Sequence, residues 1–379
     1  MSAKKKVLAF AREPGGADTI APVIGRLLED GKVDVVVLAK EYARARFAAA
    51  ELPYEEMVWE DEPELEKQVG KIVVAQRPDV LLTSASSRPQ DDLTEKYFWK
   101  YGADYCIPSL AVLDQWQNYM LRFSGPNKGE ELAYMPSCVA VMDEEVRRDM
   151  VAEGFPETRL YVSGHPRFEV LQKYSASVSR TQARAKVAAL GIDTDALVLS
   201  FVSEPARRFF SQEEGFDEVA TFSALLDSCS RLETDKRIEV VLKYHPRNIP
   251  EDFTNLSHSA VENRVRVHHI QNQIEPCDLL LASDLVVGMI SILLVDSVLL
   301  GVPTLSAQLG GFNHGLCVPE KYGAISVARK TEELDRAVES LLLQQDAREQ
   351  YLLKQSKFVV ARDGISRIKD RACALAGVN

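Results

Sequence analysis

Two segments of the sequence place anion-binding residues just after predicted strands. His245 follows the apolar run IEVVLKY and precedes Pro246, which favours extended geometry for the histidine. Further along, Ser291 lies in a short turn between a strand that ends at Gly288 and a helix that runs on to Gly301. A phosphate at this edge would meet an imidazole, a hydroxyl and the free amides of a helix N-terminus. The sequence therefore predicts a phosphate site built from His245, Pro246, Gly288 and Ser291.

Two further residues belong to this predicted site. Ser203 stands where the strand ALVLSFV gives way to a loop, and we expect it to contact the same phosphate. Asp296 lies further along the helix that follows Ser291, where it would face either a ribose or solvent. No DxD pair fits a bridge between a metal and a nucleotide, so we expect neither a metal nor a cofactor.

The first predicted strand is followed by the segment REPGGADTIAP. Gly15 and Gly16 allow a tight turn, and Asp18 or Thr19 can cap the helix that follows. Free amides at that helix N-terminus suit an anion or a sugar hydroxyl. Glu13 and Asp18 are candidate catalytic carboxylates, although a purely structural turn is the alternative. The pattern is not GxGxxG, so a dinucleotide site is not expected.

Another segment, VLDQWQNYMLRF, combines aromatic and polar residues at a strand end. Asp114 is a third candidate catalytic carboxylate, with a helix cap as its alternative. Trp116 is expected to line an acceptor site together with Gly15 and Gly16, and a core anchor is the equal alternative. For His165, in SGHPRF, a structural role at the crossover between domains is preferred over ligand contact.

Composition indicates a soluble globular protein long enough for two domains. The chain has 379 residues, of which 46% are hydrophobic and 27% charged. Its net charge of −11 argues against generic nucleic-acid binding. The N-terminal apolar run is too short for a signal peptide, and the segment 290–300 is too short and polar to span a bilayer. The six dispersed cysteines fit reduced thiols of a cytoplasmic protein.

The elements that must position these residues alternate regularly along the chain. Apolar runs typical of buried strands alternate with amphipathic helical stretches, which predicts an α/β fold with parallel sheets covered on both faces. We expect two Rossmann-like, doubly wound domains facing across a cleft. The first is residues 1–165, the acceptor domain, and the second is residues 166–360, the donor domain. Residues 361–379 form a C-terminal helix.

These residues resemble the GT-B superfamily of nucleotide-sugar enzymes. The resemblance is carried by KYHP, by SDLVVGMISILLVDSVLLGVPTL and by PSCVAVMDEEVRRDMVAEGFPETRLYVSGHPRFEVL, and it covers most of the chain. The HP motif followed by a serine is similar to bacterial sialyltransferases, polysialyltransferases and CDP-glycerol glycerophosphotransferases, in which the His and Ser hold the phosphate of a CMP or CDP donor. The resemblance implies this role for His245 and Ser291, and the return of the C-terminal helix to the N-terminal domain.

We therefore expect a metal-independent glycosyltransferase of surface-polysaccharide or glycoconjugate synthesis. It would move a sugar from a CMP-, CDP- or UDP-linked donor to an acceptor hydroxyl, with His245 and Ser291 stabilising the leaving phosphate and a carboxylate taking the acceptor proton. Its partners would be the nucleotide-sugar donor and a glycan or lipid-linked acceptor, which could bring peripheral membrane contact. One alternative is an enzyme similar to non-hydrolysing UDP-GlcNAc 2-epimerases. Another is a non-catalytic sugar-nucleotide-binding protein of the same fold.

Overall fold

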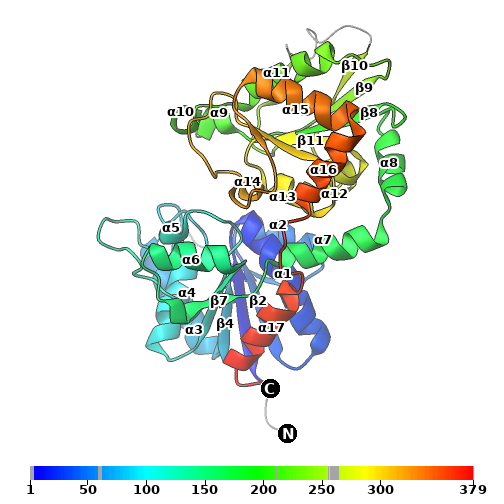
Figure 1. Ribbon diagram of the computed structural model, residues 1–379. Coiled ribbons are helices and arrows are strands. Elements are labelled where there is room, and N and C mark those ends of the chain that lie inside the picture. The colour runs from blue at the N-terminus through cyan, green and yellow to red at the C-terminus, as the bar shows by residue number, and fades with distance from the viewer. Residues whose placement is uncertain (1–3, 59–61, 210, 255, 257–263, 379) are drawn as a thin grey trace. The chain divides into compact units, whose positions relative to one another are not determined.

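The computed structural model divides into two compact units (Figure 1). It describes residues 4–58, 62–209, 211–254, 256 and 264–378. The first unit comprises Met1–Val170 and Val360–Asn379, and the second comprises Leu171–Val359. The chain passes from one unit to the other inside helix α7 (Pro166–Ser177), a few residues beyond the boundary expected from the sequence.

The first unit is built on a seven-stranded parallel sheet with the order β3-β2-β1-β4-β5-β6-β7. Its strands are β1 (Lys6–Ala11), β2 (Asp34–Ala39), β3 (Glu55–Glu56), β4 (Val80–Thr83), β5 (Ser109–Val112), β6 (Cys138–Val141) and β7 (Leu160–Val162). The central strands are buried apolar runs, as parallel strands covered on both faces require. The predicted α/β class with parallel sheets is confirmed.

Helices supply a core on each face of this sheet. They are α1 (Pro14–Asp30), α2 (Tyr42–Ala49), α3 (Glu62–Gln76), α4 (Thr94–Asp104), α5 (Tyr119–Phe123), α6 (Glu144–Ala152), the 3-10 turn Glu157–Arg159 and α17 (Gly364–Leu375). Because side chains alternate along a strand, Val7 and Ala9 pack in the cluster that includes α1 and α17. Leu8 and Phe10 pack in the opposite cluster, with α3 and α4.

The last helix of the chain belongs to the first unit. Ile365 and Ile368 of α17 are buried in the same core as Ile24 of α1. At the surface, Lys369 Nζ lies 2.6 Å from Asp30 Oδ2, at the C-terminal end of α1. Helix α16 (Gln345–Gln355) is separate from α17, because α16 ends well before α17 begins.

The second unit has a six-stranded parallel sheet with the order β10-β9-β8-β11-β12-β13. Its strands are β8 (Leu197–Val202), β9 (Ile238–Lys243), β10 (Val265–Ile270), β11 (Leu285–Gly288), β12 (Thr304–Ala307) and β13 (Val327–Ala328). The remaining helices are α8 (Arg180–Ala188), α9 (Ala206–Phe209), α10 (Ser211–Glu214), α11 (Glu218–Arg231), the 3-10 turn Pro250–Phe253, α12 (Pro276–Ala282), α13 (Ile292–Leu299), α14 (Val318–Lys321), α15 (Thr331–Leu343) and α16.

Each sheet has one place where the strand order reverses. In the first sheet β1 lies beside β4, and in the second β8 lies beside β11. Connections leave such a pair toward opposite faces, which opens a crevice outside the carboxyl ends of the two strands. In each unit a ligand is therefore expected at the loops that follow this pair.

Helix α1 begins earlier than the sequence predicted. Glu13 is its N-cap and Pro14 its first residue, so the expectation that Asp18 or Thr19 caps the helix is wrong. Proline is well placed at a first helical position because its fixed φ suits the helix and its missing N–H is not needed there. Gly15 therefore belongs to the first helical turn, where its carbonyl accepts the Thr19 hydroxyl at 2.8 Å.

Across the part of the chain that the structure describes, every helix is either too short or too polar to cross a bilayer. The apolar segment after Gly288 accordingly folds into α13, which has only eight residues.

Candidate functional site

His245 follows β9 and presents one ring nitrogen outward from a rigid turn. The ring Nδ1 of His245 accepts the backbone N–H of Arg247 at 3.1 Å. The backbone N–H of His245 donates to Asn248 Oδ1 at 2.8 Å. Since Nδ1 is an acceptor, the proton of the neutral ring sits on Nε2. Burial, followed by the charges of Arg247 and Lys243, lowers the pKa of His245. At neutral pH the residue therefore offers an uncharged Nε2–H donor at the carboxyl edge of the sheet.

A second His-Pro-Arg turn in the first unit has the same internal geometry but a different environment. His165 Nδ1 accepts the N–H of Arg167 at 3.1 Å, whereas His165 Nε2 lies 3.3 Å from the carbonyl oxygen of Asp114. The ring is only 3% exposed and stacks on Trp116 at 5.5 Å between centroids. This histidine is thus engaged in packing at the start of α7, in keeping with the structural role preferred for it.

The N-terminus of α13 lies at the end of β11. Ser291 is its N-cap, half-buried, and its Oγ accepts the N–H of Leu293 at 3.4 Å. The N–H of Ile290 donates to Glu204 Oε2 at 2.8 Å. Between the two predicted contacts, Ser203 directly follows β8. Its hydroxyl is buried and has no hydrogen-bond partner within the described parts of the chain.

Glu204, beside Ser203, is a half-buried carboxyl group at the carboxyl edge of this sheet. Burial raises its pKa to about 7, the charge of Glu218 acts in the same direction, and the hydrogen bond from Ile290 partly opposes both. The sequence analysis identified the end of this strand at Ser203. It gave no indication that the pKa of Glu204 would be raised. The group can therefore change its charge near neutral pH, directly under the helix N-terminus.

The strand order fixes how far apart the two predicted phosphate contacts are. β8 lies between β9 and β11, and neighbouring strands are about 4.8 Å apart, so His245 and Ser291 follow strands roughly 10 Å apart. They share one edge of one sheet, with Ser203 between them. That both contact a single phosphate stays a prediction, because a ligand would have to bridge this span.

Two other predicted members have clear structural positions. A Cβ on Gly288 would lie 2.6 Å from Val202 Cγ2 and 3.0 Å from the Val202 carbonyl oxygen, so glycine is needed where β11 approaches β8. Asp296 is 0% exposed within α13, so the expectation that it could face solvent is wrong. Its role at a ribose stays a prediction, as does that of Pro246, which is exposed in the turn.

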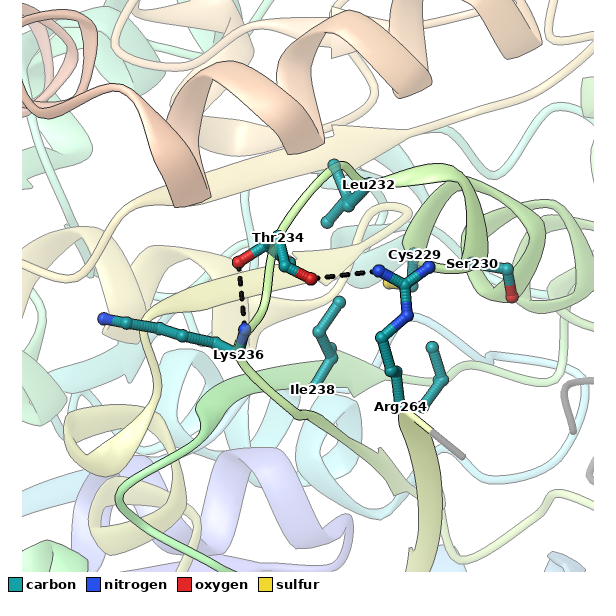
Figure 2. Close-up of a pocket in the computed structure, with 8 residues that line it drawn as sticks. Cys229, Ser230, Leu232, Thr234, Lys236, Ile238 and Arg264 are labelled. Atoms are coloured by element: carbon teal, nitrogen blue, oxygen red, sulfur yellow. Dashed lines mark hydrogen bonds between the residues drawn. The ribbon is translucent and has the colours of Figure 1, made fainter. Parts of the chain in front are cut away.

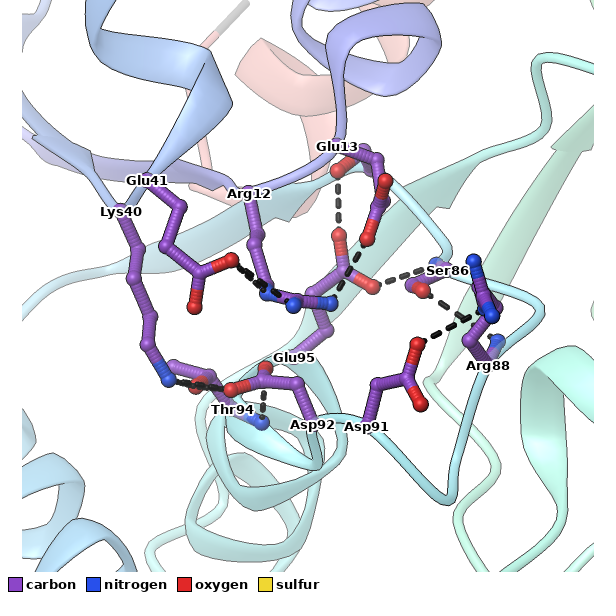
Figure 3. A network of polar contacts seen from close by, with 11 residues as sticks. Arg12, Glu13, Lys40, Glu41, Ser86, Arg88, Asp91, Asp92, Thr94 and Glu95 are labelled. Atoms are coloured by element: carbon purple, nitrogen blue, oxygen red, sulfur yellow. Dashed lines mark hydrogen bonds and ion pairs between the residues drawn. The ribbon is translucent and has the colours of Figure 1, made fainter. Parts of the chain in front are cut away.

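The carboxyl edge of the first sheet carries a network of charged side chains (Figure 3). Arg12, directly after β1, donates through Nη1 to Glu13 Oε1 at 2.6 Å. On its other side, Arg12 Nε lies 3.0 Å from Glu41 Oε2, and Lys40 forms a buried ion pair with Asp92. The sequence analysis did not identify Arg12, Lys40 and Glu41 as site residues. Their position directly after two predicted strands was the signal that could have found them.

A buried glutamate holds the loop that follows β4. Glu95 accepts the Ser84 hydroxyl and the Ser86 N–H, and burial raises the pKa of Glu95 despite these two bonds (Figure 3). A Cβ on Gly16 would lie 2.4 Å from Ser84 Cβ, so glycine is what lets α1 approach this loop. Ser84 and Ser86 of this loop are buried.

The remaining acceptor-side predictions fall at three places in the first unit. Asp114 is bound by Arg122 Nη1 at 2.7 Å, and a Cβ on Gly15 would lie 2.6 Å from Asp114 Oδ2. Asp18 is exposed on α1, with its Oδ2 3.7 Å from Arg46 Nε. Trp116 is 7% exposed and donates its indole N–H to Asp143, which is the anchor role that the sequence left open. Acceptor contact by Trp116 stays a prediction.

A small pocket in the second unit lies at the opposite edge of the sheet (Figure 2). It is lined by Leu232, Thr234, Lys236 and Arg264, near the amino ends of β9 and β10, and Arg264 Nη1 donates to the Thr234 carbonyl oxygen at 2.9 Å. Its volume of about 10 Å³ is room for one water at most. It is therefore no candidate for a nucleotide site.

Comparison with known proteins identifies the fold. No family model and no curated protein matches the sequence. Among solved structures, the UDP-GlcNAc 2-epimerase of Neisseria meningitidis bound to UDP-GlcNAc has a TM-score of 0.70 at 15% identity, covering 98% of this chain and 99% of that one. A Rickettsia africae glycosyltransferase has a TM-score of 0.65 at 9% identity, with 98% of each chain covered. MurG of Acinetobacter baumannii has a TM-score of 0.59 at 11% identity, covering 98% of this chain and 99% of that one.

The fold is GT-B. The predicted GT-B-type fold is confirmed over nearly the whole chain. At these identities the likeness leaves the reaction to be argued from the residues of this chain.

Proposed function

We propose that the protein is an enzyme that binds the phosphate of a nucleotide sugar at the carboxyl ends of β8, β9 and β11. The observation that carries this proposal is the turn at His245, which fixes the imidazole tautomer and leaves Nε2–H without a partner among the residues described. The N-terminus of α13 and the buried, unpartnered hydroxyl of Ser203 lie at the same sheet edge. Donor groups of this kind suit a phosphate.

The reaction that best fits these groups is sugar transfer. The acceptor oxygen forms a bond to the anomeric carbon of the sugar, and the bond from that carbon to the phosphate oxygen breaks. The electron pair of that bond leaves on the nucleotide, where His245 Nε2–H and the amides of α13 stabilise the growing negative charge. The acceptor proton passes to a carboxylate, which completes a metal-independent glycosyltransferase reaction.

An epimerase is the second candidate, because UDP-GlcNAc 2-epimerases recur among the similar structures. Such an enzyme would use the same phosphate site, but it would convert its nucleotide sugar in the absence of any acceptor.

A nucleotide panel tests the proposal. CMP, CDP, UDP, GDP and their sugar conjugates are each added to the full chain, and thermal unfolding is recorded. A ligand at about 100 times its Kd stabilises the folded state by about 2.7 kcal/mol, so at least one nucleotide should raise the unfolding temperature by several degrees. Conversion of the sugar without acceptor favours the epimerase, and consumption only with acceptor favours the transferase. If no nucleotide shifts the transition, the proposal is wrong.

Ser291 offers a prediction that separates capping from ligand contact. Ser291→Ala should lower stability by about 1 kcal/mol because the cap of α13 is lost, whereas Ser291→Gly should cost only a few tenths. Both variants lack the hydroxyl, so both should weaken nucleotide binding by roughly 10- to 100-fold, as expected for one hydrogen bond to a charged phosphate. Isothermal titration and urea unfolding measure the two effects. Wild-type affinity in both variants would assign Ser291 to capping alone.

A further inference from the structure

Three arginine side chains of the second unit surround one carboxylate. Arg180 Nη2 lies 2.6 Å from Asp284 Oδ1, and Arg184 Nη2 lies 2.8 Å from Asp284 Oδ2. Arg348 Nη1 lies 3.9 Å from the same Oδ1. Arg180 and Arg184 belong to α8, and Arg348 belongs to α16 (Figure 1). This arginine cluster therefore combines three positive charges with one negative charge, in a chain whose net charge is −11.

The arginine cluster lies at the amino edge of the second sheet. Asp284 directly precedes β11, and its Oδ2 accepts the N–H of Val198, near the start of β8, at 2.9 Å. The predicted phosphate contacts of the candidate nucleotide site follow the other ends of these strands. The four residues of β11 alone span about 13 Å. The arginine cluster is therefore separate from the candidate nucleotide site.

Arg184 has a structural role in the cluster. Its guanidinium donates to the carbonyl oxygens of Ala282 at 3.2 Å and Thr194 at 2.6 Å, as well as to Asp284. These bonds hold α8 against the end of α12 and the loop before β8. Asp284 balances only one of the three positive charges, so two remain unbalanced within the cluster.

Arg348 is the least satisfied of the three arginines. Its side chain is 25% exposed, and its guanidinium donates no hydrogen bond to any residue that the structure describes. Burial lowers the pKa of Arg348, the Asp284 carboxylate opposes this, and the charges of Arg180 and Arg184 add to it. The Nε of Arg180 is also buried without a partner among the residues described. Because partly desolvated cations are costly when unpaired, an anion at this point would be stabilising.

The position of Arg348 is fixed by contacts further along α16. The Tyr351 hydroxyl donates to the Thr304 carbonyl oxygen at 2.8 Å, and Gln355 Oε1 accepts the Thr304 N–H at 2.9 Å. Residues three and seven apart lie on one face of a helix, so Arg348 is on the face that packs against β12. The guanidinium is thus held at the cluster before any ligand binds.

We propose that Arg180 and Arg348 bind a doubly charged phosphate group at the amino edge of the second sheet. Two guanidinium groups that approach one carboxylate oxygen can also share an anion, because their N–H groups match phosphate oxygens in pairs. The ligand charge offsets the two positive charges that Asp284 leaves unbalanced. Inorganic phosphate and a phosphate monoester both present this group. The inference is independent of the proposed function, since no residue of the candidate nucleotide site takes part.

Titration of the full chain with inorganic phosphate tests the inference, at about pH 8, where phosphate is doubly charged, and at constant ionic strength. Arg348→Gln should weaken phosphate binding roughly 10- to 100-fold, as expected for hydrogen bonds to a charged group. Phosphate at about ten times its Kd should raise the unfolding temperature of the wild type by about 3–6 °C, but not that of the variant. Without phosphate, Arg348→Gln should be at least as stable as the wild type, because it loses no hydrogen bond and relieves repulsion. A purely structural Arg348 would instead make the variant less stable with or without phosphate.

Arg336 supplies a matched control, because it is an exposed arginine on α15 of the same unit. Arg336→Gln removes the same charge and should keep wild-type phosphate affinity. Phosphate could also enter the candidate nucleotide site, so the titrations are repeated in the His245→Ala background, where the dependence on Arg348 should persist. Wild-type phosphate affinity in Arg348→Gln, or equal losses in Arg348→Gln and Arg336→Gln, would overturn the inference. So would loss of all phosphate binding in His245→Ala.

Glucose 6-phosphate, titrated in the same way, distinguishes the two sources of the phosphate group. Tighter binding than inorganic phosphate, with the same dependence on Arg348, would assign the site to a phosphate ester. Equal or weaker binding would assign it to free phosphate. If neither compound binds the wild type, the inference is wrong.

Discussion

Replacing His245 with alanine is expected to weaken nucleotide binding by roughly 10- to 100-fold. A hydrogen bond to a charged group contributes about 1.5–3 kcal/mol, and each 1.4 kcal/mol is a factor of ten in Kd. The loss in kcat/KM should be at least as large, since charge on the phosphate grows as the sugar leaves. His245→Gln, which can place an amide N–H near the position of Nε2, should recover part of the affinity. Isothermal titration with the nucleotide from the panel measures the change.

His165 is the matched control for this experiment. It has the same turn geometry, but its Nε2 faces the carbonyl oxygen of Asp114 within the first unit. His165→Ala should leave nucleotide affinity unchanged. All three tryptophans of the sequence lie within residues 1–170, and Trp116 stacks on His165. The His165 variant should therefore alter tryptophan fluorescence, whereas the His245 variant should not. Equal losses of affinity in both variants would indicate a general folding defect instead of a phosphate contact.

Glu204→Gln is expected to stabilise the second unit at pH 8 by about 3 kcal/mol and to change little at pH 4.5. The pKa of Glu204 is raised to about 7 in the folded state from 4.5, and each pKa unit corresponds to about 1.4 kcal/mol. Its favourable contribution is therefore complete below pH 4.5 and is lost as the pH rises through 7. Glutamine keeps an oxygen to accept the Ile290 N–H but carries no charge, so the variant should not show this loss.

The same substitution should strengthen nucleotide binding at pH 8. A charged Glu204 competes with a phosphate for the positive end of α13, and its removal lessens the repulsion. Urea unfolding followed by circular dichroism at pH 4.5 and pH 8 measures stability, and titration at pH 8 measures affinity. Tryptophan fluorescence, which reports the first unit, should be unchanged. A variant less stable than the wild type at pH 8 would show that the carboxylate is stabilised by contacts that outweigh its burial.

The alternation of strands and helices could be predicted from the sequence because its signal is local. VLAFA, DVLLT and RIEVVLK are apolar runs bounded by turns and helices, and they form β1, β4 and β9. The order of the strands was not predicted, because it depends on pairing between distant segments. His245 and Ser291 were found for the same reason, because both come directly after a predicted strand.

The beginning of α1 shows that local sequence patterns do not reveal contacts between distant segments. Gly15 and Gly16 were interpreted as a turn, whereas both lie in the first helical turn. Their glycine character is explained by close approach to Asp114 and Ser84, residues about seventy to a hundred positions away in the sequence. A contact of that kind leaves no periodic pattern.

The buried charges could not be predicted for a related reason. Glu95 and the pair of Lys40 with Asp92 are buried, although such residues are exposed in most proteins. Glu204 is half-buried. Whether a carboxylate is buried depends on which distant groups satisfy it, such as the Ile290 N–H for Glu204. The positive φ of Glu41 likewise becomes visible only with the backbone angles of the structure.

The most direct test of the phosphate site is a histidine NMR titration of the full chain. With ¹⁵N-labelled histidine, the ring nitrogens of His245 are assigned from the signal that disappears in His245→Gln. Addition of the bound nucleotide should shift the Nε2 resonance of His245, as expected when that N–H donates to a phosphate, and should leave His165 unchanged. Unchanged His245 resonances at nucleotide saturation would contradict the proposed site.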